Sequence, residues 1–269
     1  MLSQRLLTAA ILLAAVVAAL FLLPDQWWAL VLLVPVAIAL WEWGGLIGWN
    51  GWPRTLLCAI GVGCCVLLWI ALAAGAHAIA IAVLVVSLAF WIAAVPWYLG
   101  GRLPLRRAAG AVAGLLVTVP AWLALVLLPR PWLLLMLLAI IWISDSAAYF
   151  AGRAYGRRKL APSISPGKTW EGVAGALAAV TMYFVALWFI FLRTQPAAHF
   201  FREWALFLAI AVLGIVGDLF ESWIKRRAGA KDSGHWLPGH GGILDRIDAL
   251  TAGMPLAALC YAAGRIFAG

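Results

Sequence analysis

The feature of this sequence that most restricts its fold is a series of nine long apolar runs, which together take up most of the 269 residues. A transmembrane helix needs about 20 consecutive, mainly apolar residues, and each run is close to that length. The runs are continuous and do not alternate between apolar and polar residues, which excludes a membrane β-barrel. We therefore expect an all-α, polytopic membrane protein with about nine transmembrane helices. The runs are residues 6–23, 27–43, 56–74, 78–96, 108–128, 132–151, 173–192, 204–224 and 249–267.

Composition leads to the same class of protein. Hydrophobic residues make up 66% of the chain, charged residues 11%, and the mean hydropathy is +1.04. A soluble domain is about half apolar and a quarter charged, so an ordinary soluble globule and a disordered chain are both excluded. The four cysteines lie inside apolar runs without the spacing of metal ligands, and we interpret them as small buried apolar side chains.

Basic residues predict the orientation in the membrane. The chain carries a net charge of +9, and with nine spans 15 of the 19 Lys and Arg residues fall on the side of the N-terminus. Basic loops stay in the cytoplasm, so we expect the N-terminus and the long basic loops to be cytoplasmic. This rule and contact with anionic lipid headgroups explain the positive charge, and we expect no nucleic-acid partner.

Acidic residues divide the chain into two parts. The first 140 residues contain Asp25 and Glu42, whereas the remaining 129 contain eight acidic residues. We interpret residues 1–140 as a transmembrane scaffold and residues 141–269 as the catalytic region. The predicted cytoplasmic loops of the catalytic region are residues 152–170 and 225–248.

One face of the eighth apolar run carries charged and polar groups. Four residues are spaced i, i+3, i+4 and i+7, which places them on one side of a helix: Asp218, Glu221, Ser222 and Lys225. An acidic face that becomes basic at the membrane surface is unusual for a structural helix. We therefore predict that this face belongs to a site of chemistry.

Acidic residues also mark two other runs, with Asp145 in the sixth and Asp245 and Asp248 at the start of the ninth. A carboxylate costs roughly 2.5–3.5 kcal/mol at the centre of a membrane helix and less near its ends. Converging carboxylates repel one another unless a cation lies between them. Their oxygen atoms suit Mg²⁺, so we predict a magnesium site.

The segment between the eighth and ninth runs combines basic residues with glycines. Glycine allows close approach of the backbone to a ligand, and basic side chains with free amides can bind phosphate. Carboxylates for Mg²⁺ together with donors for phosphate are typical of phosphoryl or nucleotidyl transfer. His240, set among glycines, is a candidate phosphate contact or proton carrier. The other phosphate-binding candidates are Lys225, Arg226, Lys231, Gly241, Gly242 and Arg246.

A second basic segment precedes the seventh run. Its Gly167-Lys168-Thr169 sequence is similar to the end of a P-loop, but Pro162 stands where a P-loop has its first glycine, so we reject a P-loop. Ser165-Pro166 followed by Glu171 predicts a helix start, whose amide donors would face an anion. The candidate substrate-binding residues of this segment are Ser165, Lys168, Thr169 and Glu171.

Four short segments together carry a family resemblance. They read SWIKR at residues 222–226, KDSG at 231–234, LPGHGG at 237–242 and DRID at 245–248. Over these residues the chain resembles the signature of the phosphatidate cytidylyltransferases, also called CDP-diacylglycerol synthases. Residues 144–145 and 165–171 are also similar to that family.

The resemblance implies that CTP and phosphatidate react to give CDP-diacylglycerol and pyrophosphate. It implies Mg²⁺ as the cofactor, K⁺ as a candidate second ion, and a homodimer. By motif position, the metal-binding aspartates of the family correspond to Asp218 and Asp245. The compact chain, without a long N-terminal extension, favours a bacterial inner membrane with the active site facing the cytoplasm.

These implications give each candidate residue a role. Asp218 and Asp245 would bind the metal, with Asp145 and Asp248 as helpers. The phosphates of both substrates would be held by Lys225, Arg226, Lys231 and Arg246. The triphosphate or the leaving pyrophosphate would be bound by Ser165, Lys168 and Thr169. The remaining substrate-binding candidates are Glu221, Ser222, Asp232 and His240, of which the acidic residues and the histidine would orient the basic groups.

Two other functions remain open. A CTP-dependent lipid kinase, such as a polyprenol kinase, shares CTP, Mg²⁺ and the membrane, but it releases CDP instead of pyrophosphate. An ion-coupled transporter would use Asp145 and Asp218 to carry cations. A transporter tends to place its site near the midplane and to contain a repeat, whereas these acids lie near one face and no repeat is visible.

Overall fold

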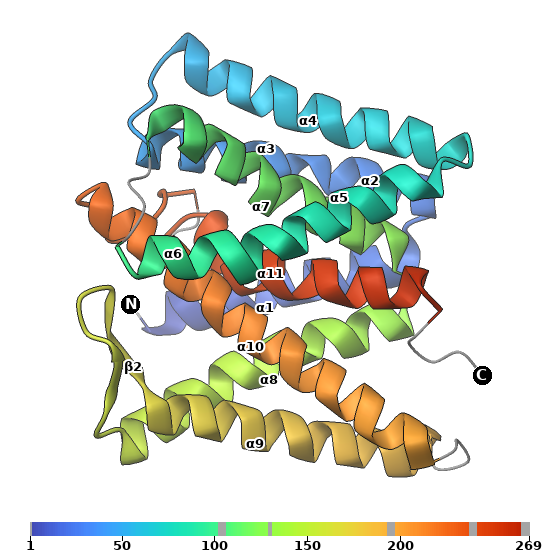
Figure 1. The fold of residues 1–269 in the computed structure, drawn as a ribbon, viewed down its shortest axis with the longest axis vertical. Helices are drawn as coiled ribbons and strands as arrows, with labels where there is room; N and C mark the ends of the chain where they lie inside the picture. The colour runs from blue at the N-terminus through green and yellow to red at the C-terminus, as the bar shows by residue number, and fades with distance from the viewer. Residues whose placement is uncertain (1, 102–105, 129–130, 193–196, 237–240, 265–269) are drawn as a thin grey trace.

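The computed structural model describes residues 2–101, 106–128, 131–192, 197–236 and 241–264. The chain forms a bundle of helices (Figure 1). Its first half contains α1 (Leu2–Leu22), α2 (Asp25–Val31), α3 (Leu33–Leu46), α4 (Trp52–Ala73), α5 (His77–Ala89), η1 (Phe90–Ala94), α6 (Val95–Leu99) and α7 (Arg107–Leu127). Its second half contains α8 (Trp132–Tyr155), β1 (Lys159–Ala161), β2 (Ser165–Thr169), α9 (Trp170–Leu187), η2 (Trp188–Leu192), α10 (Ala197–Arg227) and α11 (Leu244–Ala262).

Within the described residues, each predicted apolar run lies mainly on helix, which confirms the helical membrane class. Within the described residues, seven helical segments are long and apolar enough to cross a membrane, from Asp25–Leu46 to His199–Arg227. Helices α1 and α11 are not among these seven. The count of nine spans and the orientation of the N-terminus therefore stay predictions.

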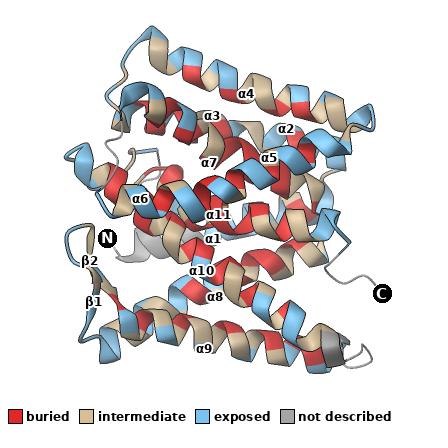
Figure 2. Cartoon of the chain, viewed as in Figure 1, coloured by how far each residue is buried: buried red, intermediate tan, exposed pale blue. Residues whose placement is uncertain are grey.

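Helix α11 lies near the middle of the bundle and packs against α10, α7, α5 and α8. Figure 2 shows mainly buried residues along α11 and α7. Small residues allow α10 and α11 to approach closely, because a Cβ atom added at Gly217 would lie 2.5 Å from the carbonyl oxygen of Asp248. Such small-residue contacts are how membrane helices pack tightly without a hydrophobic driving force. The close crossing brings the polar ends of α10 and α11 together.

A short antiparallel hairpin of β1 and β2 connects α8 to α9, with Lys159 opposite Thr169 and Ala161 opposite Ser165. The predicted helix start at Ser165 is wrong, because α9 begins at Trp170 and Thr169 is its N-cap. The Thr169 hydroxyl accepts a hydrogen bond from the backbone N–H of Gly172 at 3.1 Å, as N-cap side chains do. Pro166 and Gly167 are poor helix formers, which favours the extended strand. Figure 1 shows the hairpin at the same end of the bundle as the segment that follows α10.

Candidate active site at the ends of α10 and α11

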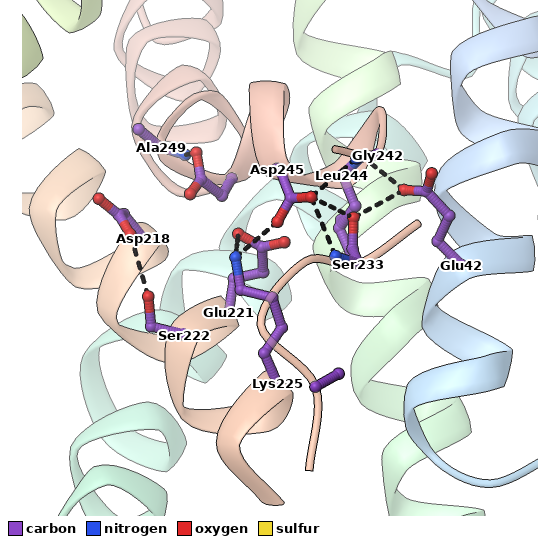
Figure 3. A network of polar contacts seen from close by, with 12 residues as sticks. Glu42, Asp218, Glu221, Ser222, Lys225, Ser233, Gly242, Leu244, Asp245 and Ala249 are labelled. Atoms are coloured by element: carbon purple, nitrogen blue, oxygen red, sulfur yellow. Dashed lines mark hydrogen bonds and ion pairs between the residues drawn. The ribbon is translucent and has the colours of Figure 1, made fainter. Parts of the chain in front are cut away.

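The polar face predicted for the eighth run is present on α10. Ser222 donates a hydrogen bond to Asp218 Oδ1 at 3.3 Å, and Lys225 Nζ donates to Glu221 Oε2 at 3.2 Å. Both contacts join residues four apart, as expected for neighbours on one side of a helix. The prediction that these four residues share a face is confirmed (Figure 3).

Lys225 also joins α10 to α11. Its Nζ donates to Asp245 Oδ1 at 2.5 Å, and the two side chains are only 12% and 6% exposed. Removing two charged groups from water costs free energy. A buried ion pair is therefore stable only where further hydrogen bonds satisfy the remaining donors and acceptors of both groups. Lys225 therefore depends on both Glu221 and Asp245 as partners.

Asp245 receives those further hydrogen bonds on its other oxygen. Oδ2 accepts from the backbone N–H of Gly242 at 2.8 Å, from the N–H of Ser233 at 2.9 Å and from the Ser233 hydroxyl at 3.0 Å. Burial alone would raise the pKa of Asp245, but the bonds from Lys225, Gly242 and Ser233 outweigh it and lower the pKa. The Asp245 carboxylate is thus held in its charged form.

Gly241 shows why the segment before α11 needs glycine. Its φ is +80°, a conformation that other residues adopt at a cost. A Cβ atom at this position would lie 2.6 Å from Asp245 Oδ2. Gly241 was predicted to let the backbone approach a ligand closely. In the structure, the group that the backbone approaches is the Asp245 carboxylate of the protein itself.

The hairpin contributes Lys168 to Asp218 of α10, the other aspartate predicted to bind metal. Lys168 Nζ lies 2.5 Å from Asp218 Oδ2, and the side chains are 23% and 32% exposed. Sequence reasoning placed Lys168 near a triphosphate and did not predict this partner. Each of the two aspartates predicted to bind metal is thus paired with a lysine.

Further carboxylates surround Asp218. The charges of Asp218 and Asp145 both act on Asp248, which also faces Glu221. Glu221 is 3% exposed, and its Oε1 is buried without a hydrogen-bond partner. Glu221 and Asp248 also interact with each other, so either a cation or a proton shared between the two carboxyl groups would satisfy this oxygen. Within the described residues, however, no three acidic, histidine or cysteine side chains are arranged as a complete metal site.

Glu42 of α3 is a site residue that sequence reasoning missed. It is 1% exposed, and its carboxylate accepts hydrogen bonds from the N–H of Ile243 at 3.1 Å and of Leu244 at 2.8 Å. The Ser233 hydroxyl lies 2.9 Å from Glu42 Oε2. The signal was an acidic residue near the end of an apolar run, because ionisable groups within membrane segments are by default candidates for function.

Other predicted residues lie outside this cluster. The Glu171 carboxylate accepts from the backbone N–H groups of Arg157 and Arg158, each at 3.1 Å, and so orders the turn after α8. The Thr169 hydroxyl caps α9. Arg226 Nε donates to the carbonyl of Ile164 at 3.2 Å. These contacts hold the hairpin to the ends of α8, α9 and α10.

Arg226 also lines a cleft of about 430 Å³ between the hairpin, the end of α10 and the residues that follow α6. Arg246 is exposed, and its charge acts on Asp145. Lys231 and Asp232 are exposed, and Ser165 is half-buried at the start of β2. His240 lies outside the described residues.

Comparison with known proteins identifies relatives along almost the whole chain. The profile of the cytidylyltransferase family matches residues 3–263. A phosphatidate cytidylyltransferase of Pseudomonas aeruginosa is 40% identical over 285 residues, covering 98% of both chains. One of Haemophilus influenzae is 35% identical over 293 residues, covering 97% of this chain and 99% of its own. One of Brucella melitensis is 51% identical over 136 residues, covering 50% of this chain and 47% of its own.

Proposed function

Because this chain belongs to the cytidylyltransferase family, we propose that it carries out its reaction where the carboxylates and lysines of α10, α11 and the hairpin meet. The family membership confirms the resemblance carried by the sequence motifs. The chain transfers the cytidylyl group of CTP to phosphatidate, which gives CDP-diacylglycerol and pyrophosphate. It is a multi-pass membrane protein, as suits an enzyme whose lipid substrate lies in the bilayer.

One observation carries the assignment of the site. Two aspartates from neighbouring helices each contact a lysine, Asp218 with Lys168 and Asp245 with Lys225. Transfer of a nucleotidyl group needs positive charge near the phosphates and a fixed geometry around the reacting phosphorus. The arrangement supplies lysine charges held in place by hydrogen-bonded carboxylates.

We infer a mechanism that depends on positioning and charge. A phosphate oxygen of phosphatidate attacks the α-phosphorus of CTP, and pyrophosphate leaves. The attacking oxygen is already an anion, so a strong general base is not required. Lys168 and Lys225 would stabilise negative charge on the phosphates, and Asp218 and Asp245 would hold these lysines in place.

The carboxylates are also suitable for Mg²⁺. Asp218, Asp145 and Asp248 interact electrostatically, and the buried Glu221 Oε1 has no partner, which supports a cation at this point. We propose that Asp218 and Asp245 hold Mg²⁺, with Asp145 and Asp248 as helpers and K⁺ as a candidate second ion. Mg²⁺, when bound, would neutralise charge on the CTP phosphates.

The cytoplasmic orientation of the site and a homodimer are further parts of the proposal. With nine spans, 15 of the 19 basic residues fall on the side of the N-terminus, which supports this orientation. It is also supported by Figure 1, in which the N-terminus lies at the same end of the bundle as the hairpin. The homodimer rests on the family resemblance alone.

The test is an omission assay with detergent-purified protein. Pyrophosphate release should require CTP, phosphatidate and Mg²⁺ together, and the lipid product should be CDP-diacylglycerol. Release of CDP with a lipid alcohol as acceptor would instead identify a lipid kinase. Folded protein with no turnover on any lipid would overturn the proposed function and favour a transporter.

A further inference from the structure

We propose that Glu42 is a positioning residue for Asp245, so that the N-terminal half of the chain takes part in the reaction. This inference rests on the proposed function, because Asp245 belongs to the site proposed there. Glu42 lies on α3, about 200 residues away from its partners in sequence, with hydrogen bonds to Ser233, Ile243 and Leu244. Figure 3 shows its carboxylate directed at the segment that leads into α11.

The first step of the argument is the start of α11. The first N–H groups of a helix have no partners within the helix, and the N-cap of α11, Ile243, makes no side-chain hydrogen bond. Glu42 accepts from the N–H of Ile243 and of the next residue, Leu244. A carboxylate is also favoured by the positive end of the helix dipole. Glu42 therefore fixes the first turn of α11, the turn that carries Asp245.

The second step is the serine shared by the two carboxylates. Ser233 Oγ lies 2.9 Å from Glu42 Oε2 and 3.0 Å from Asp245 Oδ2. The backbone N–H of Ser233 donates to Asp245 as well. A change at Glu42 therefore reaches Asp245 both through the helix start and through Ser233.

The third step is the absence of spare room around the Glu42 carboxylate. A Cβ atom added at Gly234 or at Gly242 would lie 2.4 Å from a Glu42 oxygen. The segment before α11 therefore packs directly against the Glu42 carboxylate at two glycines, Gly234 and Gly242. This contact leaves little freedom for Gly242, whose N–H donates to Asp245.

Glu42→Gln tests the proposal with almost no change in volume. Both oxygens of Glu42 accept from backbone N–H groups, and glutamine has one oxygen and one NH₂ group. In either orientation the NH₂ group faces an N–H donor, so one contact is lost. Glu203→Gln is the matched control, because Glu203 is also a buried carboxylate of 2% exposure but is paired with Arg202 near the opposite end of α10.

Two measurements on full-length protein in detergent decide the outcome. We expect Glu42→Gln to lower kcat for CDP-diacylglycerol formation by about 10- to 100-fold, the range for residues that orient a metal-binding side chain. The KM for CTP should change less than kcat, because both Glu42 oxygens are occupied by donors of the chain itself. Hydrogen exchange should become faster at the amides of Ile243 and Leu244, with Glu203→Gln close to wild type in both measurements.

Wild-type exchange at Ile243 and Leu244, or a kcat equal to that of Glu203→Gln, would overturn the proposal. If Glu42→Gln does not fold, Glu42→Asp replaces it, because this variant keeps the charge but withdraws the carboxylate from the N–H groups of Ile243 and Leu244. Unchanged kcat and unchanged exchange at these two amides in Glu42→Asp would then overturn the proposal. Wild-type protein without turnover would instead refute the proposed function, and the exchange data would separate that result from a failure at Glu42.

Discussion

Replacing Asp245 by asparagine tests how the charges of the site are held together. The substitution keeps the shape of the side chain but exchanges one carboxylate oxygen for an NH₂ group. In the native protein Oδ1 accepts from Lys225 and Oδ2 accepts from three donors of Ser233 and Gly242. Asparagine can serve one of these two sides only.

The expected loss of stability follows from either orientation. If the NH₂ group faces Lys225, a charge-assisted hydrogen bond worth about 1.5–3 kcal/mol is lost. If it faces Ser233 and Gly242, buried donors remain unsatisfied at about 1–3 kcal/mol each. Lys225 keeps Glu221 as a partner. We therefore expect Asp245→Asn to lower the free energy of unfolding by roughly 3 kcal/mol while the protein still folds.

Asp218→Asn is the matched comparison. Its ion pair with Lys168 is partly exposed, and such pairs contribute only about 0–1 kcal/mol. Unfolding titrations in mixed detergent micelles should therefore show a large loss for Asp245→Asn and a small one for Asp218→Asn. Pyrophosphate release should be abolished in both. Equal stabilities for the two variants would refute the reasoning on hydrogen bonds, and near-normal turnover in either would refute its place in the site.

Two further predictions concern the glycines and the hairpin. Gly241→Ala should reduce turnover about tenfold or more, because the added Cβ would press on the Asp245 carboxylate. Gly229→Ala is the control: Gly229 also has a positive φ, +68°, but open space surrounds it, so this variant should be strained yet active. Steady-state kinetics compare the two variants, and equal activities would contradict the prediction. Lys168→Met should lower kcat/KM for CTP about tenfold or more, since it removes a positive charge from the site. The control is Lys159→Met, which removes an exposed lysine of β1. Equal effects of the two substitutions would contradict a specific role of Lys168 in binding the CTP phosphates.

The helices and much of the site were predictable because they depend on local spacing. The interval from Asp218 to Lys225 places both residues on one face of α10 whatever surrounds the helix. The carboxylate at the start of α11 was predicted to meet that face, and Asp245 does contact Lys225. These predictions needed only the helical period and the cost of unpaired charge in a membrane.

The contacts between distant segments were not predictable in the same way. Glu42 meets Ser233 and α11 only because α3 packs beside them, and no local pattern encodes that pairing. The pairing of Lys168 with Asp218 likewise depends on the hairpin, where sequence reasoning expected a helix start. The break at Leu32 and the wider helical turn at Phe90–Ala94 also carry no signal in the apolar runs.

The most direct test of the central claim is the fate of the phosphorus atoms of CTP. Purified protein is given phosphatidate and CTP labelled either at the α-phosphorus or at the γ-phosphorus, and the lipid is extracted and counted. The account predicts label in the lipid from α-labelled CTP only, and none with Asp218→Asn. Label in the lipid from γ-labelled CTP would contradict cytidylyl transfer, and full incorporation by Asp218→Asn would contradict the site at α10 and α11.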